Sequence, residues 1–161
     1  MLIRDLSPGS DTDRIEALYA EAADYWILAD RTAPDRAKAE EFFTDAPPGC
    51  DVAASHHLGL FVDDRLSGVA ELAFGFPDPG DAYLGLMILA PRLRGQGLGR
   101  RLLAEAEDRA RRAGAQRLYL AVLDENPRGR AFWEREGFVD TGVWRDDAEA
   151  RHRLRRMVKA L

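Results

Sequence analysis

The chain has little of what disulfide-bonded, zinc-binding and membrane proteins need. Of its 161 residues only Cys50 is a cysteine, so no intrachain disulfide can form, and no cluster of Cys and His suggests zinc. The longest apolar run covers residues 83–90, far below the roughly twenty residues that cross a bilayer. Residues 1–7 are not followed by the apolar core of a signal peptide. We therefore expect a soluble, cytoplasmic protein with no metal and no membrane partner.

Internal repeats, low-complexity segments and linkers are also missing. A length of 161 residues with 46% hydrophobic content is enough for one compact core and too short for two ordinary domains. The sequence therefore predicts a single domain over residues 1–161. It does not determine the oligomeric state, and a homodimer is one possibility.

Basic residues are scarce in the first half of the chain. Residues 1–91 carry 6 basic and 17 acidic side chains, a net −11, whereas residues 92–161 carry 17 basic and 11 acidic, a net +6. Such asymmetry can signal nucleic-acid binding, but no platform of interleaved aromatic and basic residues accompanies it, so we expect no nucleic-acid partner. A polyanionic small ligand explains the basic half equally well. The acidic half suits a cationic amine or is an ordinary solvated surface.

The first third of the chain reads as helical after one short strand, over residues 2–6. Ser10 or Asp11 is expected to cap a helix with an apolar face that continues towards Leu28. Pro34 suits the first position of a second helix.

The rest of the chain alternates in the manner of an α/β fold. Three consecutive strands with short turns predict an antiparallel meander, over residues 58–62, 66–76 and 82–89. A helix over residues 98–113 then leads to a strand over residues 117–122, and this unit implies a right-handed crossover between parallel strands. A short helix and a hairpin close the chain, over residues 126–136, 139–144 and 153–159.

A glycine-rich turn stands where the third of these strands gives way to the long helix. Glycines at every second position let a ligand approach the backbone and permit positive φ values. A helix that begins here directs unpaired N–H groups, and the positive end of its dipole, at the turn. The turn therefore predicts an anion-binding site, and its sequence is Arg94-Gly95-Gln96-Gly97-Leu98-Gly99.

The spacing of the turn excludes two common phosphate-binding motifs. A Rossmann fingerprint needs its third glycine where this chain has Arg100, and a Walker A loop needs Gly-Lys before Ser or Thr, whereas Gly99 precedes two arginines. What matches is Arg or Gln, two residues, Gly, one residue, then Gly or Ala, here Arg94, Gly97 and Gly99. This pattern resembles the acetyl-CoA pyrophosphate loop of the GCN5-related N-acetyltransferase (GNAT) superfamily.

A second segment carries the same resemblance. In the superfamily an Asn is followed by a short helix with an aromatic pair and then by Gly-Phe, and this chain matches without a gap, with Asn126, Phe132, Trp133, Gly137 and Phe138. The resemblance spans residues 66–139. It implies a single-domain GNAT fold of the α/β class, with a mixed central sheet, an antiparallel meander, a splayed parallel strand pair and about four helices.

The resemblance also implies an activity. Members transfer the acetyl group of acetyl-CoA, as cosubstrate, to a primary amine by direct attack in a ternary complex. A small metabolite, an antibiotic and a protein amine are all open as acceptors. The alternative is a catalytically silent acyl-CoA-binding module of the same fold.

The resemblance assigns the binding of acetyl-CoA mostly to backbone groups. The turn and the first helical residues would hold the pyrophosphate, namely Arg94, Gly95, Gln96, Gly97, Leu98, Gly99 and Arg100. The pantetheine would pair as an added strand with Met87, Ile88 and Leu89. Arg94, Arg100 or Arg101 is a candidate contact of the 3′-phosphate, although a solvated helix face explains the last two equally well. Asn126 matches the cofactor-contacting Asn of the superfamily and also suits a helix N-cap.

Two steps of the transfer need further groups. The donor to the developing oxyanion would be the backbone N–H of Leu89. Glu71 is the favoured base, because it lies mid-strand among apolar residues and partial burial there would raise its pKa. The weaker candidates are Tyr83, Asp24, His56 and His57, of which the two histidines are expected in a polar turn before a strand.

The chain departs from the superfamily at the proton donor. Many members have a tyrosine where this chain has Trp133, whose indole N–H is no usable acid. A thiol has a pKa of about 8.5, so a thiolate is a tolerable leaving group that water can protonate. Trp133 is then either a wall of the thioester pocket or a core residue. The expected acceptor pocket comprises Tyr25, Trp26, Glu71 and Tyr83, although a Tyr-Trp pair on an amphipathic helix also suits a core.

Overall fold

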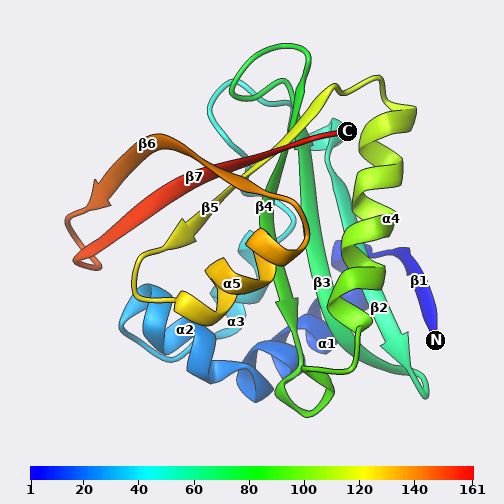
Figure 1. Ribbon diagram of the computed structural model, residues 1–161. Helices are drawn as coiled ribbons and strands as arrows, with labels where there is room; N and C mark the ends of the chain where they lie inside the picture. The colour runs from blue at the N-terminus through cyan, green and yellow to red at the C-terminus, as the bar shows by residue number, and fades with distance from the viewer.

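The computed structural model describes residues 1–161 as a seven-stranded mixed sheet with helices against both faces (Figure 1). The order of the strands is β1-β2-β3-β4-β5-β7-β6, and every neighbouring pair is antiparallel except β4 and β5. No helix has both the length and the apolar character that crossing a membrane requires. The strands are β1 (Leu2–Asp5), β2 (His56–Val62), β3 (Arg65–Phe74), β4 (Asp81–Leu89), β5 (Arg117–Leu123), β6 (Val139–Asp147) and β7 (His152–Ala160).

The first helix begins earlier than the sequence predicts. Its N-cap is Ser7, and neither Ser10 nor Asp11 caps it. Asp11 is instead buried, because its carboxylate accepts hydrogen bonds from the Ser7 N–H and from two guanidinium nitrogens of Arg4, each at 2.9 Å. The helix also ends short of Leu28, so the predicted single helix is two. The helices of this region are α1 (Pro8–Glu21), α2 (Ala23–Asp30) and α3 (Arg36–Glu41).

Helix α3 corrects a second predicted start. Asp35 is its N-cap and accepts a hydrogen bond from the Lys38 N–H at 2.9 Å, so Pro34 lies outside the helix. The Asp35 side chain accepts a hydrogen bond from a free N–H of the first turn. Pro34 has no side-chain acceptor and cannot cap the helix in this way.

The predicted meander and crossover are present. Strands β2, β3 and β4 pair antiparallel in sequence order, and α4 (Leu98–Arg112) connects β4 to its parallel neighbour β5. His56 and His57 belong to β2 rather than to a turn before it. The His57 ring packs 5.2 Å from the ring of Phe42, which explains why two polar residues extend the strand.

The chain ends with α5 (Pro127–Arg135) and the β6–β7 hairpin. Strand β7 lies between β5 and β6 in the sheet. The second strand of the hairpin therefore pairs with β5, and the first strand, β6, forms the edge of the sheet. With α1 and α2 separate, the helices number five rather than about four.

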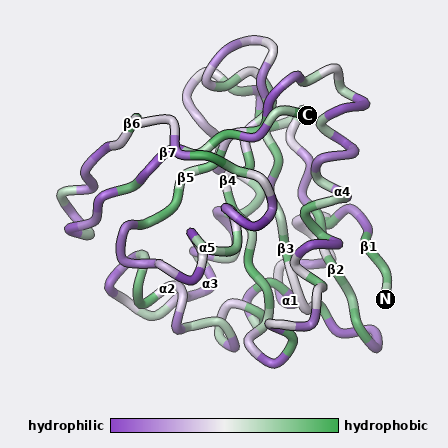
Figure 2. Tube along the Cα trace, viewed as in Figure 1, coloured by the Kyte–Doolittle hydropathy of each residue, from purple (hydrophilic) through white to green (hydrophobic).

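Two apolar cores lie on opposite faces of the sheet, and hydrophobic residues mark the central strands in Figure 2. One core joins β2, β3, β4, β5 and β7 with α4, and includes Leu72, Leu102 and Met157. The other joins α1 to α3 with β2, β3 and β4, and includes Trp26 and Val69. Because side chains alternate along a strand, each residue of β3 and β4 faces either α4 or the N-terminal helices.

Candidate functional site

Strands β4 and β5 are paired over only part of their length. The pairing covers Asp81 with Arg117, Ala82 with Leu118 and Tyr83 with Tyr119. Beyond Tyr83 the two strands diverge, which Figure 1 shows as a gap between them. The carboxyl end of β4 is therefore paired with β3 alone.

The unpaired edge of β4 presents backbone groups to this gap. Ala90 donates its N–H to the Ser67 carbonyl at 2.8 Å, so the backbone groups of Ala90 face β3. Hydrogen-bonding direction alternates along an antiparallel strand, so Ile88 also faces β3 while Met87 and Leu89 direct their N–H and C=O groups into the gap. The Leu89 carbonyl accepts a hydrogen bond from Arg94 Nε at 3.2 Å.

The glycine turn follows this edge of β4. Gly95 and Gly97 have φ values of +78° and +80°, and a Cβ atom built on either residue meets no atom within 4 Å. Gly97 is the N-cap of α4, and no side chain caps the helix. The N–H groups of the first turn of α4 thus face open space beside two residues that lack side chains, which is the geometry of an anion site.

Arginines near the turn already have partners. The Arg94 guanidinium donates to both carboxylate oxygens of Asp24, at 2.7 and 3.3 Å. Arg100 pairs with Glu136 at 3.2 Å, and its side chain is largely exposed. Of the three candidate contacts of a 3′-phosphate, Arg101 is the one with no acidic partner.

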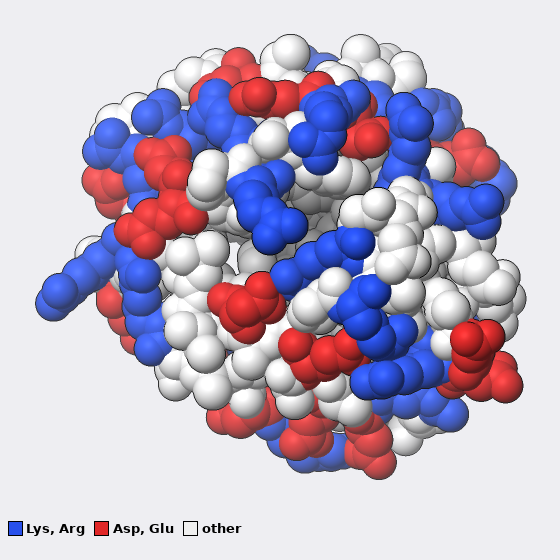
Figure 3. Space-filling view, turned by 60° about the horizontal axis from the view of Figure 1, so that its bottom comes forward, with Lys and Arg blue, Asp and Glu red and all other residues white.

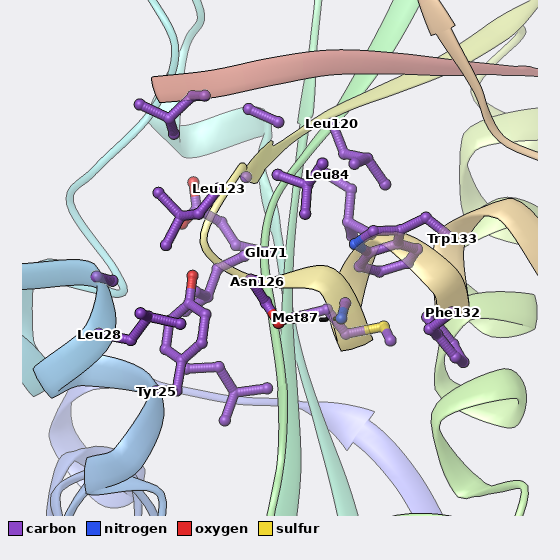
Figure 4. Close-up of a pocket in the computed structure, with 18 of the residues that line it drawn as sticks. Tyr25, Leu28, Glu71, Leu84, Met87, Leu120, Leu123, Asn126, Phe132 and Trp133 are labelled. Carbon is purple, nitrogen blue, oxygen red and sulfur yellow. Dashed lines mark hydrogen bonds between the residues drawn. The ribbon is translucent and has the colours of Figure 1, made fainter. Parts of the chain in front are cut away.

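A cavity of about 1290 Å³ connects the glycine turn, the gap beside β4 and the helices α2 and α3. Figure 4 shows the part of it that lies between Tyr25 and Trp133. Fourteen of the residues predicted for the site line the cavity; Gln96 and Leu98 do not. Gln96 donates its side-chain N–H to the Arg92 carbonyl, and Leu98 packs on the core beneath α4. His56 and His57 are absent from the lining, whereas Asp24 is present.

Glu71 lines this cavity and has no polar partner. It lies on β3, is 5% exposed, and makes neither a hydrogen bond nor an ion pair in the structure. Burial raises the pKa of its carboxyl to about 8, and the charge of Asp45 adds to the increase. Gly85 opposite makes room for it, because a Cβ there would lie 3.1 Å from Glu71 Oε1.

The two aromatic residues predicted from α2 have different surroundings. Tyr25 points into the cavity on the same side as Glu71 (Figure 4), and burial raises its pKa. Trp26 is 6% exposed, and its ring packs 4.7 Å from that of Tyr19 and 4.8 Å from Lys38 Nζ. Trp26 therefore borders the cavity mainly as a core residue.

The second sequence segment forms the opposite wall. Asn126 caps α5, since its Oδ1 accepts a hydrogen bond from the Gly129 N–H at 3.0 Å, which confirms the predicted N-cap. The indole of Trp133 extends into the cavity near Met87 and Phe132 (Figure 4). The Trp133 ring also packs 5.5 Å from Phe138, so it is both wall and core.

Sequence reasoning missed four arginines of the cavity lining, Arg128, Arg135, Arg145 and Arg156. Figure 3 shows basic side chains around a hollow on this face. Arg145 and Arg156 belong to the closing hairpin. Only the sheet order, which puts β7 beside β5, brings them to the cavity, and no local motif signals this.

Comparison with known proteins gives a family match and a short match to a curated protein. The family described as "Acetyltransferase (GNAT) family" matches residues 15–138. Mycothiol acetyltransferase of Beutenbergia cavernae is 35% identical over 75 residues, which are 47% of this chain and 25% of that protein. The chain therefore spans about a quarter of the length of this curated relative.

Solved structures match along the whole chain. An acetyltransferase from Thermus thermophilus has a TM-score of 0.76 at 22% identity, covering 100% of this chain and 98% of that one. Ribosomal-protein-alanine N-acetyltransferase from Brucella melitensis has a TM-score of 0.75 at 22% identity, with 100% of both chains covered. PaiA N-acetyltransferase from Thermoplasma acidophilum, in complex with coenzyme A, has a TM-score of 0.72 at 21% identity, covering 99% and 98%. These likenesses confirm the predicted fold.

Proposed function

Because the chain belongs to the GNAT family of acetyltransferases, we propose that it transfers the acetyl group of acetyl-CoA to a primary amine by direct attack in a ternary complex. One observation carries the proposal: a single cavity joins an uncapped helix N-terminus behind Gly95 and Gly97 to the buried, unpartnered carboxyl of Glu71. The first feature suits the phosphates of the donor, and the second suits an amine.

The residues along the cavity fit acetyl-CoA. The open space at Gly95 and Gly97 and the free N–H groups of the first turn of α4 suit a pyrophosphate. The backbone groups of Met87 and Leu89 that face the gap suit the amides of pantetheine, which would lie along β4 as an added strand. When bound, the cosubstrate supplies a thioester carbonyl next to the end of β4.

Glu71 is the proposed base. The amine nitrogen forms a bond to the thioester carbonyl carbon, the C–S bond breaks, and the proton lost by the amine goes to Glu71. A base with a pKa near the working pH combines a large unprotonated fraction with good proton affinity, and the carboxyl of Glu71 has a pKa of about 8. Tyr25 and Tyr83 line the same part of the cavity as proposed acceptor contacts.

Backbone groups and water stabilise the two other charges that develop in the reaction, on the carbonyl oxygen and on the departing sulfur. The N–H of Leu89, which faces the gap, is the proposed donor to the carbonyl oxygen as negative charge develops there; such a donor is typically worth about 3 kcal/mol. Trp133 occupies the opposite wall and has no proton to give. The departing thiolate therefore takes its proton from water.

Release of free thiol tests the proposal. The protein is incubated with acetyl-CoA and a panel of primary amines, and thiol is measured against reactions that lack amine or protein. We expect amine-dependent release from the wild type and strongly reduced release from Glu71→Gln. Tight binding of coenzyme A without turnover of any amine would instead establish the catalytically silent binding module.

The names of the relatives point to no single acceptor. One is a mycothiol acetyltransferase and another is a ribosomal-protein-alanine N-acetyltransferase. The cavity of this chain is therefore what can indicate its own acceptor.

A further inference from the structure

Four arginines of the cavity lining have no carboxylate partner, and two of them, Arg145 and Arg156, lie on the β6–β7 hairpin. Arg145 on β6 and Arg156 on β7 both line the cavity, and neither guanidinium forms an ion pair or a side-chain hydrogen bond. Neighbouring arginines do have partners: Arg155, also on β7, pairs with Asp124 at 3.1 Å. An unpaired, half-buried guanidinium such as that of Arg156 is available to a ligand.

Both arginines lie on the face of the sheet that carries Glu71. Met157 is buried in the core beneath α4, so its neighbour Arg156 faces the opposite side, towards α2 and α3. Arg145 is opposite Leu154 in the β6–β7 ladder, and Leu154 shares the face of Arg156. Glu71 lies two residues from Val69, which is buried in the core of the N-terminal helices and therefore marks the same face.

Contacts through Phe76 connect Arg156 to Tyr83, on which the charges of Glu71 and Arg145 also act. Arg156 Cζ lies 5.1 Å from the centre of the Phe76 ring, and that ring is 5.2 Å from the ring of Tyr83. Burial raises the pKa of Tyr83, while the charges of Arg156 and Arg145 lower it and the charge of Glu71 raises it. Tyr83 thus lies within electrostatic range of the Glu71 carboxyl and of both guanidiniums.

The separation leaves room for a small molecule. Glu71 on β3 and Arg156 on β7 are three steps apart in the sheet order, and one of these steps crosses the gap between β4 and β5, so their backbones are at least about 14 Å apart. Both side chains point into the cavity from these positions. An extended molecule with different groups at its two ends fits between them.

Negative charge on the α3 side of the cavity is largely compensated. Lys38 pairs with Asp30 at 3.0 Å and with Glu41 at 3.2 Å. Asp45 has no such partner, and it is the acidic neighbour of Glu71. A diamine or polyamine would have to place its second ammonium group at Asp45, against two guanidiniums, or at Asp147, whose carboxylate already accepts hydrogen bonds from the Glu149 and Ala150 N–H groups.

We propose that the acceptor is a primary amine that also carries an oxyanion group, a carboxylate or a phosphate, which Arg145 and Arg156 bind while the amine faces Glu71. The inference rests on the proposed acetyl transfer and names its substrate class. The planar guanidinium matches both oxyanions with paired hydrogen bonds.

Matched acceptors test the inference. The panel contains ω-amino acids of increasing chain length, aminoalkyl phosphates, and amino alcohols and diamines of the same lengths. Thiol release gives kcat and KM for each amine at saturating acetyl-CoA. We expect kcat/KM at least about tenfold higher for the best oxyanion-bearing amine than for its amino alcohol, since a charge-assisted hydrogen bond is worth about 1.5–3 kcal/mol. The ω-amino acid and phosphate arms show which oxyanion is bound.

Variants assign the effect to the two arginines. Arg156→Gln and Arg145→Gln should each raise KM for the oxyanion-bearing amine about tenfold or more and leave the amino alcohol unchanged. Arg156→Glu should shift preference towards the diamine. Arg151→Gln is the matched control, because Arg151 is on the same hairpin, has no acidic partner and does not line the cavity. Circular dichroism checks that each variant is folded. If Arg156→Gln does not fold, Arg145→Gln alone tests the inference, because Arg145 is exposed and its replacement should not affect folding.

Two results would overturn this inference but not the proposed acetyl transfer. One is equal or better use of amino alcohols or diamines by the wild type; the other is an equal loss for every acceptor in both glutamine variants. Absence of thiol release with every amine would refute the acetyl transfer itself. The two failures are therefore distinguishable.

Discussion

The Arg94 guanidinium is bound to the Asp24 carboxylate through two hydrogen bonds, at 2.7 and 3.3 Å, while its Nε donates to the Leu89 carbonyl at 3.2 Å. Asp24 lies on α2, next to Tyr25 and Trp26, and Arg94 opens the glycine turn. One side chain thereby joins the turn, the end of β4 and helix α2. This contact bridges two parts of the cavity lining.

Asp24→Asn should weaken the protein little and strengthen its binding of coenzyme A. The pair is partly exposed, at 31% for Arg94 and 61% for Asp24, and such pairs contribute at most about 1 kcal/mol. Removing the carboxylate frees the guanidinium and takes a negative charge from the phosphate side, so we expect the Kd for coenzyme A to fall by about two- to fivefold. Calorimetric titration and urea unfolding measure the two effects.

Asp13→Asn is the control for this variant. Asp13 is exposed and paired with an arginine, Arg36, that lies outside the cavity, so its loss should leave coenzyme A binding unchanged. A weaker affinity in Asp24→Asn would mean that Asp24 holds Arg94 in the binding geometry.

Glu71→Gln should remove one limb of the pH–rate profile. A base acts when it is unprotonated, so the wild-type rate should rise with pH and level off above the pKa of Glu71, about 8. The variant should lose about 10²- to 10⁴-fold in kcat together with this limb, and it should keep any limb that belongs to the ionisation of the acceptor. Initial rates across pH measure both, and an unchanged rate throughout would remove Glu71 as the base.

The stability of the same variant should differ from the wild type in a pH-dependent way. The pKa of Glu71 is raised from 4.5 to about 8 by burial, so the folded state binds a proton more readily than the unfolded state. The stabilisation is complete below about pH 4.5 and is lost as pH rises through 8. Relative to the wild type, Glu71→Gln should therefore gain a few kcal/mol in free energy of unfolding across this interval. Urea titrations at a series of pH values measure the free energy of unfolding of both proteins. The same pH dependence in both would contradict the raised pKa of Glu71.

Gly97→Ala should lower the stability of the protein and weaken its binding of coenzyme A. Its φ of +80° is unfavourable for alanine, which costs about 1 kcal/mol of stability, and the added methyl group enters the space assigned to the pyrophosphate. We expect at least a tenfold rise in the Kd for coenzyme A, measured by calorimetric titration. Gly9→Ala in α1 is the matched control, since a Cβ there also meets no atom within 4 Å and the φ is not positive. It should stabilise the helix by up to about 1 kcal/mol and leave binding unchanged.

Trp133→Tyr should raise kcat, because a phenol in this part of the cavity can protonate the departing thiolate. The gain should be at most about tenfold, since a thiolate already leaves readily at neutral pH. Trp133→Phe has a similar ring and no proton to give, so it should show no gain. Equal rates for the two variants would argue that water remains the proton source in both.

Local signals in the sequence predicted the glycine turn, the crossover and the cap at Asn126, because each depends on residues that are neighbours in the chain. The misplaced elements depend on distant contacts. Asp11 reads as a cap but is buried against Arg4, and His57 reads as a turn residue but packs on Phe42. Arg145 and Arg156 carried no signal, since their position follows from the order of strands in the sheet.

Divergence of β4 and β5 after Tyr83 gives this sheet an edge in its middle. An exposed edge strand normally invites pairing with another protein chain and hence aggregation. Here residues of α2, α3 and α5 line the cavity beside this edge and cover it against a foreign β-strand. The fold thus keeps a sheet edge inside the molecule, where its free backbone groups are no hazard for aggregation.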